Sequence, residues 1–268
     1  MHGLGNDFIV FDAPPGGPPD AVTLRRLADR HTGIGFDQAL MLEPPRREGT
    51  AVYYRIFNAD GDEVEQCGNG ARCIARFVNA RLRHGPGTLV MDSPGGLVRA
   101  KVREDGQVSV AMAVPNFDPA ALPFDASGEA SVYPLALGET IVDIGAVSIG
   151  NPHAVIRVPS VADAPVDRLG PAIEHHPRFP RRTNVGFMEV VARDHVRLRV
   201  HERGAGETRA CGTGAGGAVA IGRRHGLLDE SVQVDLPGGR LTVQWKGPGE
   251  AIWLTGPAET AFEGTVNL

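Results

Sequence analysis

The sequence predicts an α+β protein of two pseudo-symmetric domains, each a curved, mainly antiparallel sheet wrapped around a central apolar helix. The first observation is a repeated motif, Cys-Gly-x-Gly-Ala, which starts at Cys67 and again at Cys211 and is followed by small and apolar residues. The second is that short β-rich segments fill most of the remaining chain. A helix that is small or apolar on all sides must be buried, and the neighbouring strands can cover it.

The repeat extends beyond the motif, which indicates an internal duplication. Asn58 lies nine residues before Cys67, and Glu202 lies nine residues before Cys211. We expect two domains, residues 1–115 and 116–268. Whether the strands that close each half are exchanged with the other half stays open at this point. The Pro-rich stretch from residue 115 to 134 is the expected connection between them.

In the first half, β-branched and aromatic runs indicate strands, and apolar residues at helical spacing indicate helices. The expected elements are a strand at 9–11, a helix at 24–30 capped by Thr23, strands at 39–42 and 52–57, a helix at 70–81, and strands at 88–91, 97–103 and 107–113. Asp105-Gly106 is the expected hairpin turn between the last two strands.

The second half follows the same signals. The expected elements are strands at 139–149 and 154–158, a helix at 166–175, strands at 185–191 and 195–201, a helix at 214–226, and strands at 232–236, 241–245 and 251–255. Between 195 and 201 apolar residues alternate with arginines, which predicts a strand with one solvated face.

Composition excludes several classes of function. The chain has 268 residues, 42% of them hydrophobic, and a net charge of −5, which does not indicate a nucleic-acid partner. No apolar run approaches the roughly 20 residues of a membrane span, so we expect a cytoplasmic protein without a membrane partner.

The number and spacing of the three cysteines do not indicate a disulfide framework or a metal site. Cys67, Cys73 and Cys211 are an odd number, without a Cys-x-x-Cys pair or a Cys/His cluster, so we expect no metal. Cys73 lies inside the first small-residue helix, where we expect a buried apolar side chain. The only lysines, Lys101 and Lys246, lie far from the repeated motif, which argues against pyridoxal phosphate; we expect no cofactor.

A cysteine at a helix start can serve in acid/base chemistry. The helix N-terminus lowers the pKa of a thiol and favours the thiolate. With two such residues, a thiolate can remove a proton from one face of a carbon while a thiol delivers one to the other face. The net result is inversion of a stereocentre. Backbone N–H groups at the two helix starts could bind the α-carboxylate of an amino acid, namely those of Gly68, Asn69, Gly212 and Thr213.

Other interpretations stay open at this point. The two Cys-Gly turns could be tight turns with buried thiols. A phosphate-binding loop is disfavoured because both motifs lack the lysine of such loops. A thiol redox protein would also use two reactive cysteines, although its pair is usually close in sequence.

The sequence strongly resembles the diaminopimelate epimerase family over nearly its whole length. The resemblance is carried by Met1-His-Gly-Leu-Gly-Asn-Asp-Phe8, Gly33-Ile-Gly-Phe-Asp-Gln38, Arg55-Ile-Phe-Asn-Ala-Asp-Gly61, Cys67-Gly-Asn-Gly-Ala-Arg-Cys73, Gly150-Asn-Pro-His153, Asn184 with Gly186-Phe187, Glu202-Arg-Gly-Ala-Gly-Glu-Thr208, Ala210-Cys-Gly-Thr-Gly-Ala215 and Asp235-Leu-Pro-Gly-Gly239.

The resemblance implies a cofactor-independent enzyme that interconverts LL- and meso-diaminopimelate in lysine and peptidoglycan precursor synthesis. It implies that Cys67 and Cys211 are the two acid/base thiols, that backbone at Gly68-Asn69 and Gly212-Thr213 holds the proximal carboxylate, and that the protein is a homodimer. Further substrate contacts are implied for Asn6, Gln38, Asn58, Asn151, Asn184, Glu202 and Arg203, and a role in tuning the thiol pKa values for His153 and Glu202.

Two related groups of the same fold are the alternatives. Proline and hydroxyproline racemases share the cysteine pair, but their first site typically reads Cys-Gly-His, where this chain has Asn69. Phenazine-pathway isomerases lack the paired thiols. Asn69 and the dipeptide Glu202-Arg203 therefore favour the diacid substrate.

Overall fold

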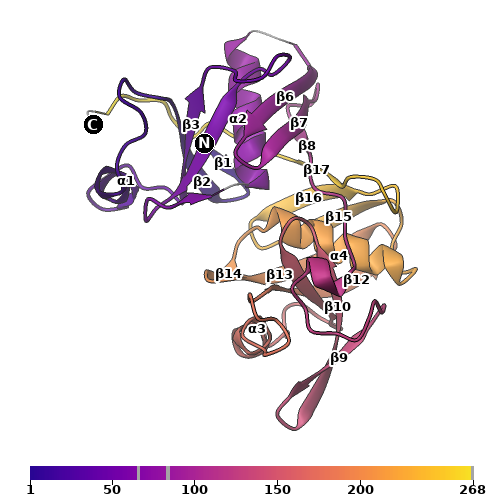
Figure 1. Cartoon of the computed structure of the whole chain (residues 1–268). Helices are drawn as coiled ribbons and strands as arrows, with labels where there is room; N and C mark the ends of the chain where they lie inside the picture. Colours follow the sequence, from indigo (N-terminus) through magenta and orange to yellow (C-terminus); the bar gives the residue numbers. More distant parts are fainter. Residues whose placement is uncertain (65–66, 83–84, 267–268) are drawn as a thin grey trace. The chain divides into compact units, whose positions relative to one another are not determined.

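The computed structural model describes residues 1–64, 67–82 and 85–266, and it divides into two compact units (Figure 1). The first unit contains Met1–Ala111 and Thr255–Leu268, and the second contains Met112–Leu254. Both combine helices with a mixed sheet, so the predicted α+β class is confirmed. None of the helices in the described ranges is long and apolar enough to cross a membrane.

In the first unit a mixed sheet packs against the central helix α2. The elements are β1 (His2–Gly3), β2 (Asn6–Asp12), α1 (Ala21–Ala28), β3 (Gln38–Glu43), β4 (Tyr53–Asn58), β5 (Glu63–Val64), α2 (Gly68–Arg81), β6 (Gly87–Ser93), β7 (Gly96–Val102) and β8 (Val108–Ala111). β2 pairs with β3, and β4 with β6, in parallel, and the other described pairings of this unit are antiparallel. α2 packs mainly against β1, β7 and β8.

Strand β3 is buried on both faces, which explains its uninterrupted apolar run. Met41 packs in a cluster with Leu24 and Leu27 of α1. Leu40 points to the other face, where its Cδ2 would lie 3.1 Å from a Cβ added at Gly70 of α2.

The second unit surrounds α4 in the same way. Its elements are η1 (Pro119–Ala121), β9 (Tyr133–Leu137), β10 (Thr140–Ser148), β11 (Pro152–Arg157), α3 (Val166–Glu174), β12 (Asn184–Ala192), β13 (His195–Glu202), β14 (Gly206–Thr208), α4 (Gly212–Arg224), β15 (Ser231–Leu236) and β16 (Gly239–Gln244); β17 (Trp253–Gly256) contains the boundary between the units. From β10 to β16 the parallel and antiparallel pairings follow the same order as from β1 to β7. This repeated order supports the expected duplication.

The residues of α4 are small because the helix lies in a crowded interior, as its composition predicts. Every residue from Gly214 to Gly222 is buried. A Cβ added at Gly217 would lie 3.3 Å from the side chain of His153, and one at Gly222 would lie 2.3 Å from Leu228 Cδ1.

The structure corrects two sequence-based expectations. The N-cap of α1 is Asp20, whose Oδ1 accepts the N–H of Thr23 at 2.8 Å, so the helix begins at Ala21 and Thr23 lies inside it. The stretch expected as a plain connection contains η1 and the start of β9, which is a strand because it pairs with β10 despite its proline at position 134.

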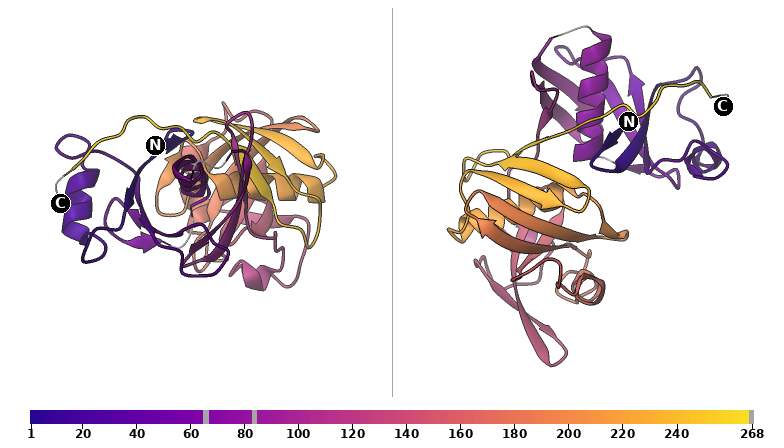
Figure 2. Two further views of the ribbon diagram at one scale, coloured as in Figure 1. Left: turned by 90° about the horizontal axis from the view of Figure 1, so that it is seen from above. Right: turned by 180° about the vertical axis from the view of Figure 1, so that it is seen from behind.

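The end of the chain belongs to the first unit and passes its amino terminus (Figure 2). His2 and Glu259 form an antiparallel bridge, with the N–H of His2 donating to the carbonyl of Glu259 at 2.8 Å. Thr255 Oγ1 lies 2.7 Å from Ser109 Oγ of β8. These contacts fix the closing segment beside β1 and β8.

Candidate active site

Cys67 is the N-cap of α2. Its backbone is extended, with φ of −147°, and its Sγ accepts the N–H of Gly70 at 3.4 Å. The helix therefore begins at Gly68, two residues earlier than its apolar spacing indicates. The cysteine side chain is half-buried, so this sulfur is not sealed inside the unit.

Two asparagine side chains lie next to Cys67. Asn6 Oδ1 lies 3.9 Å from the sulfur and accepts the Nδ2–H of Asn69 at 3.2 Å. Asn6 Nδ2 donates to Asp37 Oδ2 at 2.9 Å. The oxygen of Asn6 is thereby held toward the thiol.

Gln38 and Asn58 lie opposite each other on β3 and β4. Gln38 Nε2 donates to Asn58 Oδ1 at 2.8 Å. Gln38 Oε1 is buried and has no hydrogen-bond partner among the described residues. Since buried acceptors are almost always paired, this oxygen is a suitable partner for an N–H of a ligand.

Cys211 is the N-cap of α4, and its environment differs from that of Cys67. Its Sγ accepts the N–H of Gly214 at 3.3 Å and lies 3.6 Å from Thr213 Oγ1, and the residue is only 4% exposed. Burial raises the pKa of the Cys211 thiol well above its ordinary value, and Glu202 raises it further. The hydrogen bonds from Thr213 and Gly214 lower the pKa, but burial outweighs them. The helix start thus acts on the pKa of Cys211 in the expected direction, but the net shift is upward because burial is the larger effect.

The hairpin of β13 and β14 carries Glu202 and Arg203. Thr208 Oγ1 donates to Glu202 Oε1 at 2.5 Å, which fixes the carboxylate. Asn184 Oδ1 accepts the backbone N–H of Arg203 at 3.1 Å, and the guanidinium donates to the carbonyl of Arg181 at 3.3 Å. Asn184 thus supports the turn that carries Glu202 and Arg203.

His153 is buried, and its Nε2 lies 2.9 Å from Asn151 Oδ1. Burial lowers the pKa of His153 to about 3, and the nearby charge of Arg203 acts in the same direction. The imidazole is therefore neutral at physiological pH.

The sequence-predicted residues divide between the two units. In the first unit Asn6 contacts Cys67 and Asn69, Gly68 begins α2 directly after Cys67, and Gln38 pairs separately with Asn58. In the second unit contacts and charges link Asn151 with His153, His153 with Arg203, Arg203 with Asn184, and Cys211 with Glu202 and Thr213, while Gly212 begins α4. Sequence reasoning missed the supporting residues Asp37, Arg72, Glu174 and Thr208. Asp37, Arg72 and Thr208 lie inside motifs that carry the family resemblance, so those motifs could have pointed to them.

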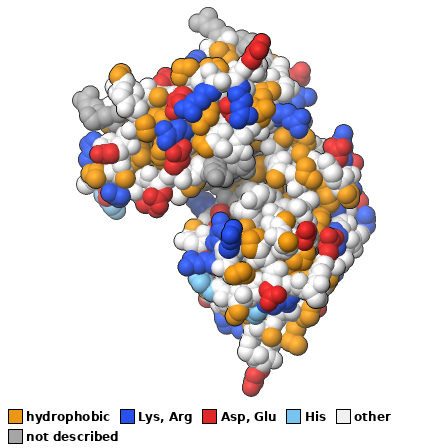
Figure 3. Space-filling view, in the orientation of Figure 1, with side chains coloured by type: hydrophobic (Ala, Val, Ile, Leu, Met, Phe, Trp, Pro, Cys, Tyr) orange, Lys and Arg blue, Asp and Glu red, His pale blue; other side chains and the backbone are white. Residues whose placement is uncertain are grey.

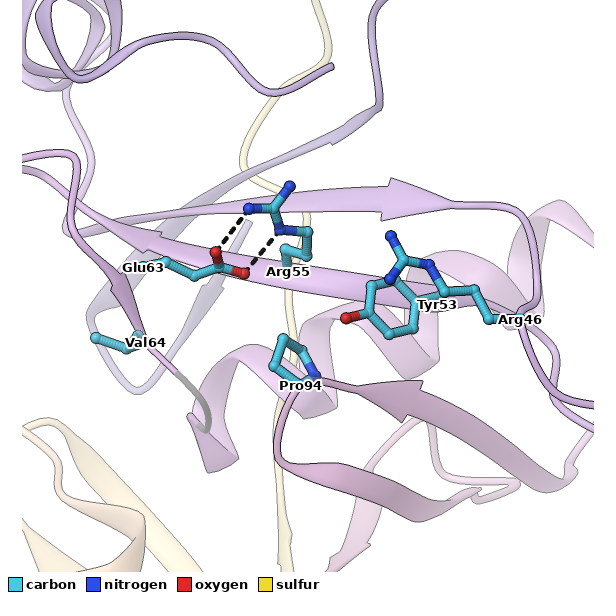
Figure 4. Close-up of a pocket in the computed structure, with 6 residues that line it drawn as sticks. All are labelled: Arg46, Tyr53, Arg55, Glu63, Val64 and Pro94. Atoms are coloured by element: carbon cyan, nitrogen blue, oxygen red, sulfur yellow. Dashed lines mark hydrogen bonds and ion pairs between the residues drawn. The ribbon is translucent and has the colours of Figure 1, made fainter.

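An open cavity of about 510 Å³ on the first unit contains none of these residues (Figure 4). Arg46, Tyr53, Arg55 and Glu63 are among its lining side chains. Arg55 and Glu63 form a two-bond ion pair at 2.7 and 2.6 Å, and Arg46 stacks 3.6 Å from the centroid of the Tyr53 ring. Acidic and basic side chains are likewise interspersed over the face shown in Figure 3. Arg55 and Glu63 are therefore paired with each other, while Arg46 packs on Tyr53 and forms an ion pair with Glu43 outside the lining.

Comparison with known proteins gives consistent results. Residues 1–117 and 145–261 match the family model "Diaminopimelate epimerase". The chain is 54% identical over 272 residues to the diaminopimelate epimerase of Nitrosomonas eutropha and 52% identical over 269 residues to that of Stutzerimonas stutzeri, covering 100% of this chain and 98% of each relative.

Among solved structures, the chain is similar to a probable proline racemase of Agrobacterium radiobacter, with a TM-score of 0.70 and 18% identity over 100% of this chain and 91% of that one. A hydroxyproline epimerase of Agrobacterium vitis gives a TM-score of 0.68 and 17% identity over 96% and 87%. At this identity the two structures bear on the fold alone.

Proposed function

Because the chain belongs to the diaminopimelate epimerase family, we propose that it interconverts LL- and meso-2,6-diaminopimelate without a cofactor. The observation that carries this proposal is identity of 52% and 54% over the whole chain to relatives of that name. The protein is thus an isomerase acting on a small amino-acid substrate. The racemase alternative has only distant structural similarity in its support.

The reaction uses Cys67 and Cys211 as a pair. One sulfur, as thiolate, takes the proton from Cα and becomes a thiol. The other, as thiol, gives its proton to the opposite face and becomes a thiolate. The substrate leaves inverted and the two sulfurs have exchanged protonation states. The raised pKa of Cys211 supports its being the thiol of the resting enzyme.

The Cα–H bond of an amino acid is a very weak acid, so the developing carbanion needs donors fixed in advance. N–H groups at the starts of α2 and α4 hold the α-carboxylate in this scheme, namely those of Gly68, Asn69, Gly212 and Thr213. The free Oε1 of Gln38 supports a role in accepting from a substrate ammonium group.

The remaining polar residues recognise the distal end of the substrate. Arg203 can pair with a carboxylate, and Glu202 with an ammonium. Asn6, Asn58, Asn151 and Asn184 add neutral hydrogen bonds. Glu202 also tunes Cys211, whereas His153 acts as a neutral group through Asn151.

The test is solvent deuterium uptake at Cα of LL-diaminopimelate, in D2O and without added cofactor. We expect uptake and formation of the meso isomer by the wild-type chain, and loss of turnover in Cys67→Ala and Cys211→Ala. L-Proline and trans-4-hydroxy-L-proline serve as competing substrates, and a thiol–disulfide exchange assay tests the redox alternative. Ordinary turnover by either cysteine variant would rule out the two-thiol scheme.

We further propose that the enzyme works in the cytoplasm as a homodimer, as family membership suggests. Sedimentation equilibrium of the full chain tests the oligomeric state. A single species at the monomer mass of 28.4 kDa contradicts the homodimer.

A further inference from the structure

The side chain of Asp37 collects three hydrogen-bond donors beside the start of β2. Its Oδ2 accepts the Nδ2–H of Asn6 at 2.9 Å and the backbone N–H of Asp7 at 3.1 Å. Its Oδ1 accepts from Arg30 Nη2 at 2.8 Å. The backbone N–H of Asp37 in turn donates to Asp7 Oδ1 at 2.9 Å. These bonds fix the carboxylate at one end of the Asn6 amide.

The amide of Asn6 has a single orientation that suits its neighbours. A side-chain amide has a donating and an accepting end, whereas a carboxylate only accepts and a guanidinium only donates. Asp37 therefore requires the NH2 group of Asn6 on its side. From the opposite direction, Arg72 Nη2 donates to Asn69 Oδ1 at 3.0 Å, so Asn69 turns its own NH2 group toward Asn6 and donates to Asn6 Oδ1 at 3.2 Å. Both ends of this chain of hydrogen bonds thus select the same orientation.

The accepting end of Asn6 faces the sulfur of Cys67. The S–H of Cys67 donates to Asn6 Oδ1, with the two heavy atoms 3.9 Å apart. An amide oxygen in this place accepts from a thiol and repels a thiolate, so it favours the thiol form. The N–H of Gly70 donates to the same sulfur at 3.4 Å and acts in the opposite direction. Asn6 is therefore a neighbour that helps Cys67 to hold a proton.

We propose that Asp37 is a positioning residue for proton transfer at Cys67: by holding the NH2 group of Asn6, it turns the amide oxygen toward the sulfur and makes the thiolate a stronger base. The proposal rests on the proposed function, in which the Cys67 thiolate takes the proton from Cα. The Cα–H bond breaks, its electron pair stays on Cα, and an S–H bond forms. Asn6 Oδ1 then accepts from this new S–H. Asp37 itself does not contact the substrate.

The basicity of the Cys67 thiolate matters because the Cα–H of an amino acid is a very weak acid. A base whose protonated form is stabilised takes a proton more readily, although a smaller fraction of it is ionised at a given pH. Loss of the Asp37 carboxylate should therefore have two effects of opposite sign. More of Cys67 should be thiolate in the free protein, and yet turnover should be slower. A merely structural role of Asp37 does not predict this combination.

Other titratable and charged groups surround this site. Arg30 also forms two hydrogen bonds with Asp7, at 2.7 and 2.8 Å, so its guanidinium keeps a carboxylate partner when Asp37 is replaced. The remaining groups are the same in every variant of Asp37. They are Arg72, Cys73 and Arg76 of α2, Tyr54 of β4, the amino group of Met1, His2 of β1 and Glu259 of the closing segment.

The first experiment follows the alkylation of Cys67 by iodoacetamide in the substrate-free protein over a range of pH, using mass spectrometry of the Cys67 peptide. Alkylation requires the thiolate. In Asp37→Leu, which cannot accept from Asn6, we expect alkylation to begin at lower pH and to be a few-fold faster at neutral pH than in the wild type. The Asp37 side chain is 43% exposed, so the fold should tolerate the change. Asp37→Ala also removes the acceptor and replaces Asp37→Leu if that variant does not fold.

Two variants separate the orientation of Asn6 from the loss of a negative charge. Asp37→Asn keeps one oxygen, and two donors, Asn6 Nδ2 and the N–H of Asp7, converge on the place where that oxygen is needed. Asp7→Asn removes a carboxylate from the same cluster and leaves the bond between Asp37 and Asn6 in place. We expect both variants to alkylate at Cys67 with a pH dependence close to that of the wild type.

Asn6→Leu tests whether Asp37 acts through Asn6. This variant removes the oxygen beside Cys67, so alkylation should again begin at lower pH. Adding Asp37→Leu to Asn6→Leu should produce no further shift, because the amide through which Asp37 acts is then absent. The double variant thus distinguishes an effect passed along the hydrogen bonds from a direct effect of Asp37 on the sulfur.

Turnover of LL-diaminopimelate supplies the second readout. In Asp37→Leu we expect kcat to fall several-fold although the thiolate of Cys67 forms at lower pH. Asp37→Asn should lose much less, because its oxygen still holds the NH2 group of Asn6. Asp7→Asn should turn over like the wild type.

Wild-type pH dependence of Cys67 alkylation in folded Asp37→Leu or Asp37→Ala overturns the proposal. An equal shift in Asp37→Asn also overturns it, because the lost charge and not the orientation of Asn6 would then be responsible. A further shift on adding Asp37→Leu to Asn6→Leu has the same consequence. If the wild-type chain fails to exchange the Cα protons of diaminopimelate, the proposed function fails, and the alkylation data still decide whether Asp37 acts on Cys67 through Asn6.

Discussion

Glu174 and His201 form a buried pair, with Glu174 Oε2 lying 2.8 Å from His201 Nε2. The two residues are 3% and 7% exposed. The other carboxylate oxygen of Glu174 accepts the N–H of Gly204 at 2.9 Å. Since Gly204 follows Glu202 and Arg203 directly, the end of α3 holds in place the turn that carries two proposed substrate contacts.

Glu174→Ala is expected to weaken both the fold and substrate binding. Losing hydrogen bonds to a buried charged group should lower the free energy of unfolding by about 2 kcal/mol, measured by urea denaturation. KM for diaminopimelate should rise several-fold with a smaller change in kcat, because the turn carrying Arg203 loses its anchor. Glu174→Gln keeps an oxygen for the N–H of Gly204 and should show a smaller rise in KM. An unchanged KM in Glu174→Ala would show that the turn holds its position without α3.

Gly145→Ala tests the close approach of β10 to α4. The added Cβ would lie 2.5 Å from Ile221 Cγ2, so the variant should lose roughly 1–3 kcal/mol of unfolding free energy by overpacking. Ile221→Ala removes the obstructing atoms, so the double variant should be more stable than the sum of the single losses predicts. Gly128→Ala is the control, since nothing lies within 4 Å of its added Cβ. Strictly additive losses would contradict the contact.

Local sequence patterns predicted the features that depend on local structure. The two small-residue helices, their cysteine N-caps and the alternation of β13 follow from residues that are neighbours in sequence. β9 escaped prediction because its strand character comes from pairing with β10, and a proline stands inside it. The N-cap of α1 was misplaced by three residues although Asp20 is a better capping residue than Thr23.

The supporting contacts of the site could not be predicted because they join distant parts of the chain. Glu174 reaches His201 across 27 positions, and Arg72 reaches Pro257 across 185. The direction of the Cys211 pKa shift was also beyond sequence reasoning, since it depends on how deeply the sulfur is buried. A helix start predicts only that its N–H groups lower the pKa of the thiol, and at Cys211 this effect is smaller than that of burial.

The ionised side chain of Asp235 should stabilise the fold, and this contribution to the free energy of unfolding should be lost in acid. The hydrogen bonds from Arg240, followed by those from His195, lower the pKa of Asp235 to about 2, against the opposing effect of burial. The folded pKa lies below the unfolded value of about 3.9, so this stabilisation is complete above pH 4 and is lost as pH falls toward 2. Because the carboxylate is 30% exposed, we expect a contribution of only about 1 kcal/mol. Asp235→Asn should flatten the fall of unfolding free energy between pH 4 and 2, and an unchanged slope would refute the assignment.

Glu202→Gln should make Cys211 a stronger acid. Burial is the first cause of the raised pKa of Cys211, and the charge of Glu202 is the second, so removing that charge should lower the pKa while leaving it above the ordinary value. The pH at which iodoacetamide alkylates Cys211, followed by peptide mass spectrometry, should therefore fall. Glu207→Gln is the matched control on the same hairpin, because Glu207 pairs with Arg199 at 2.6 Å. If both variants alkylate with the same pH dependence as the wild type, Glu202 does not act on this thiol.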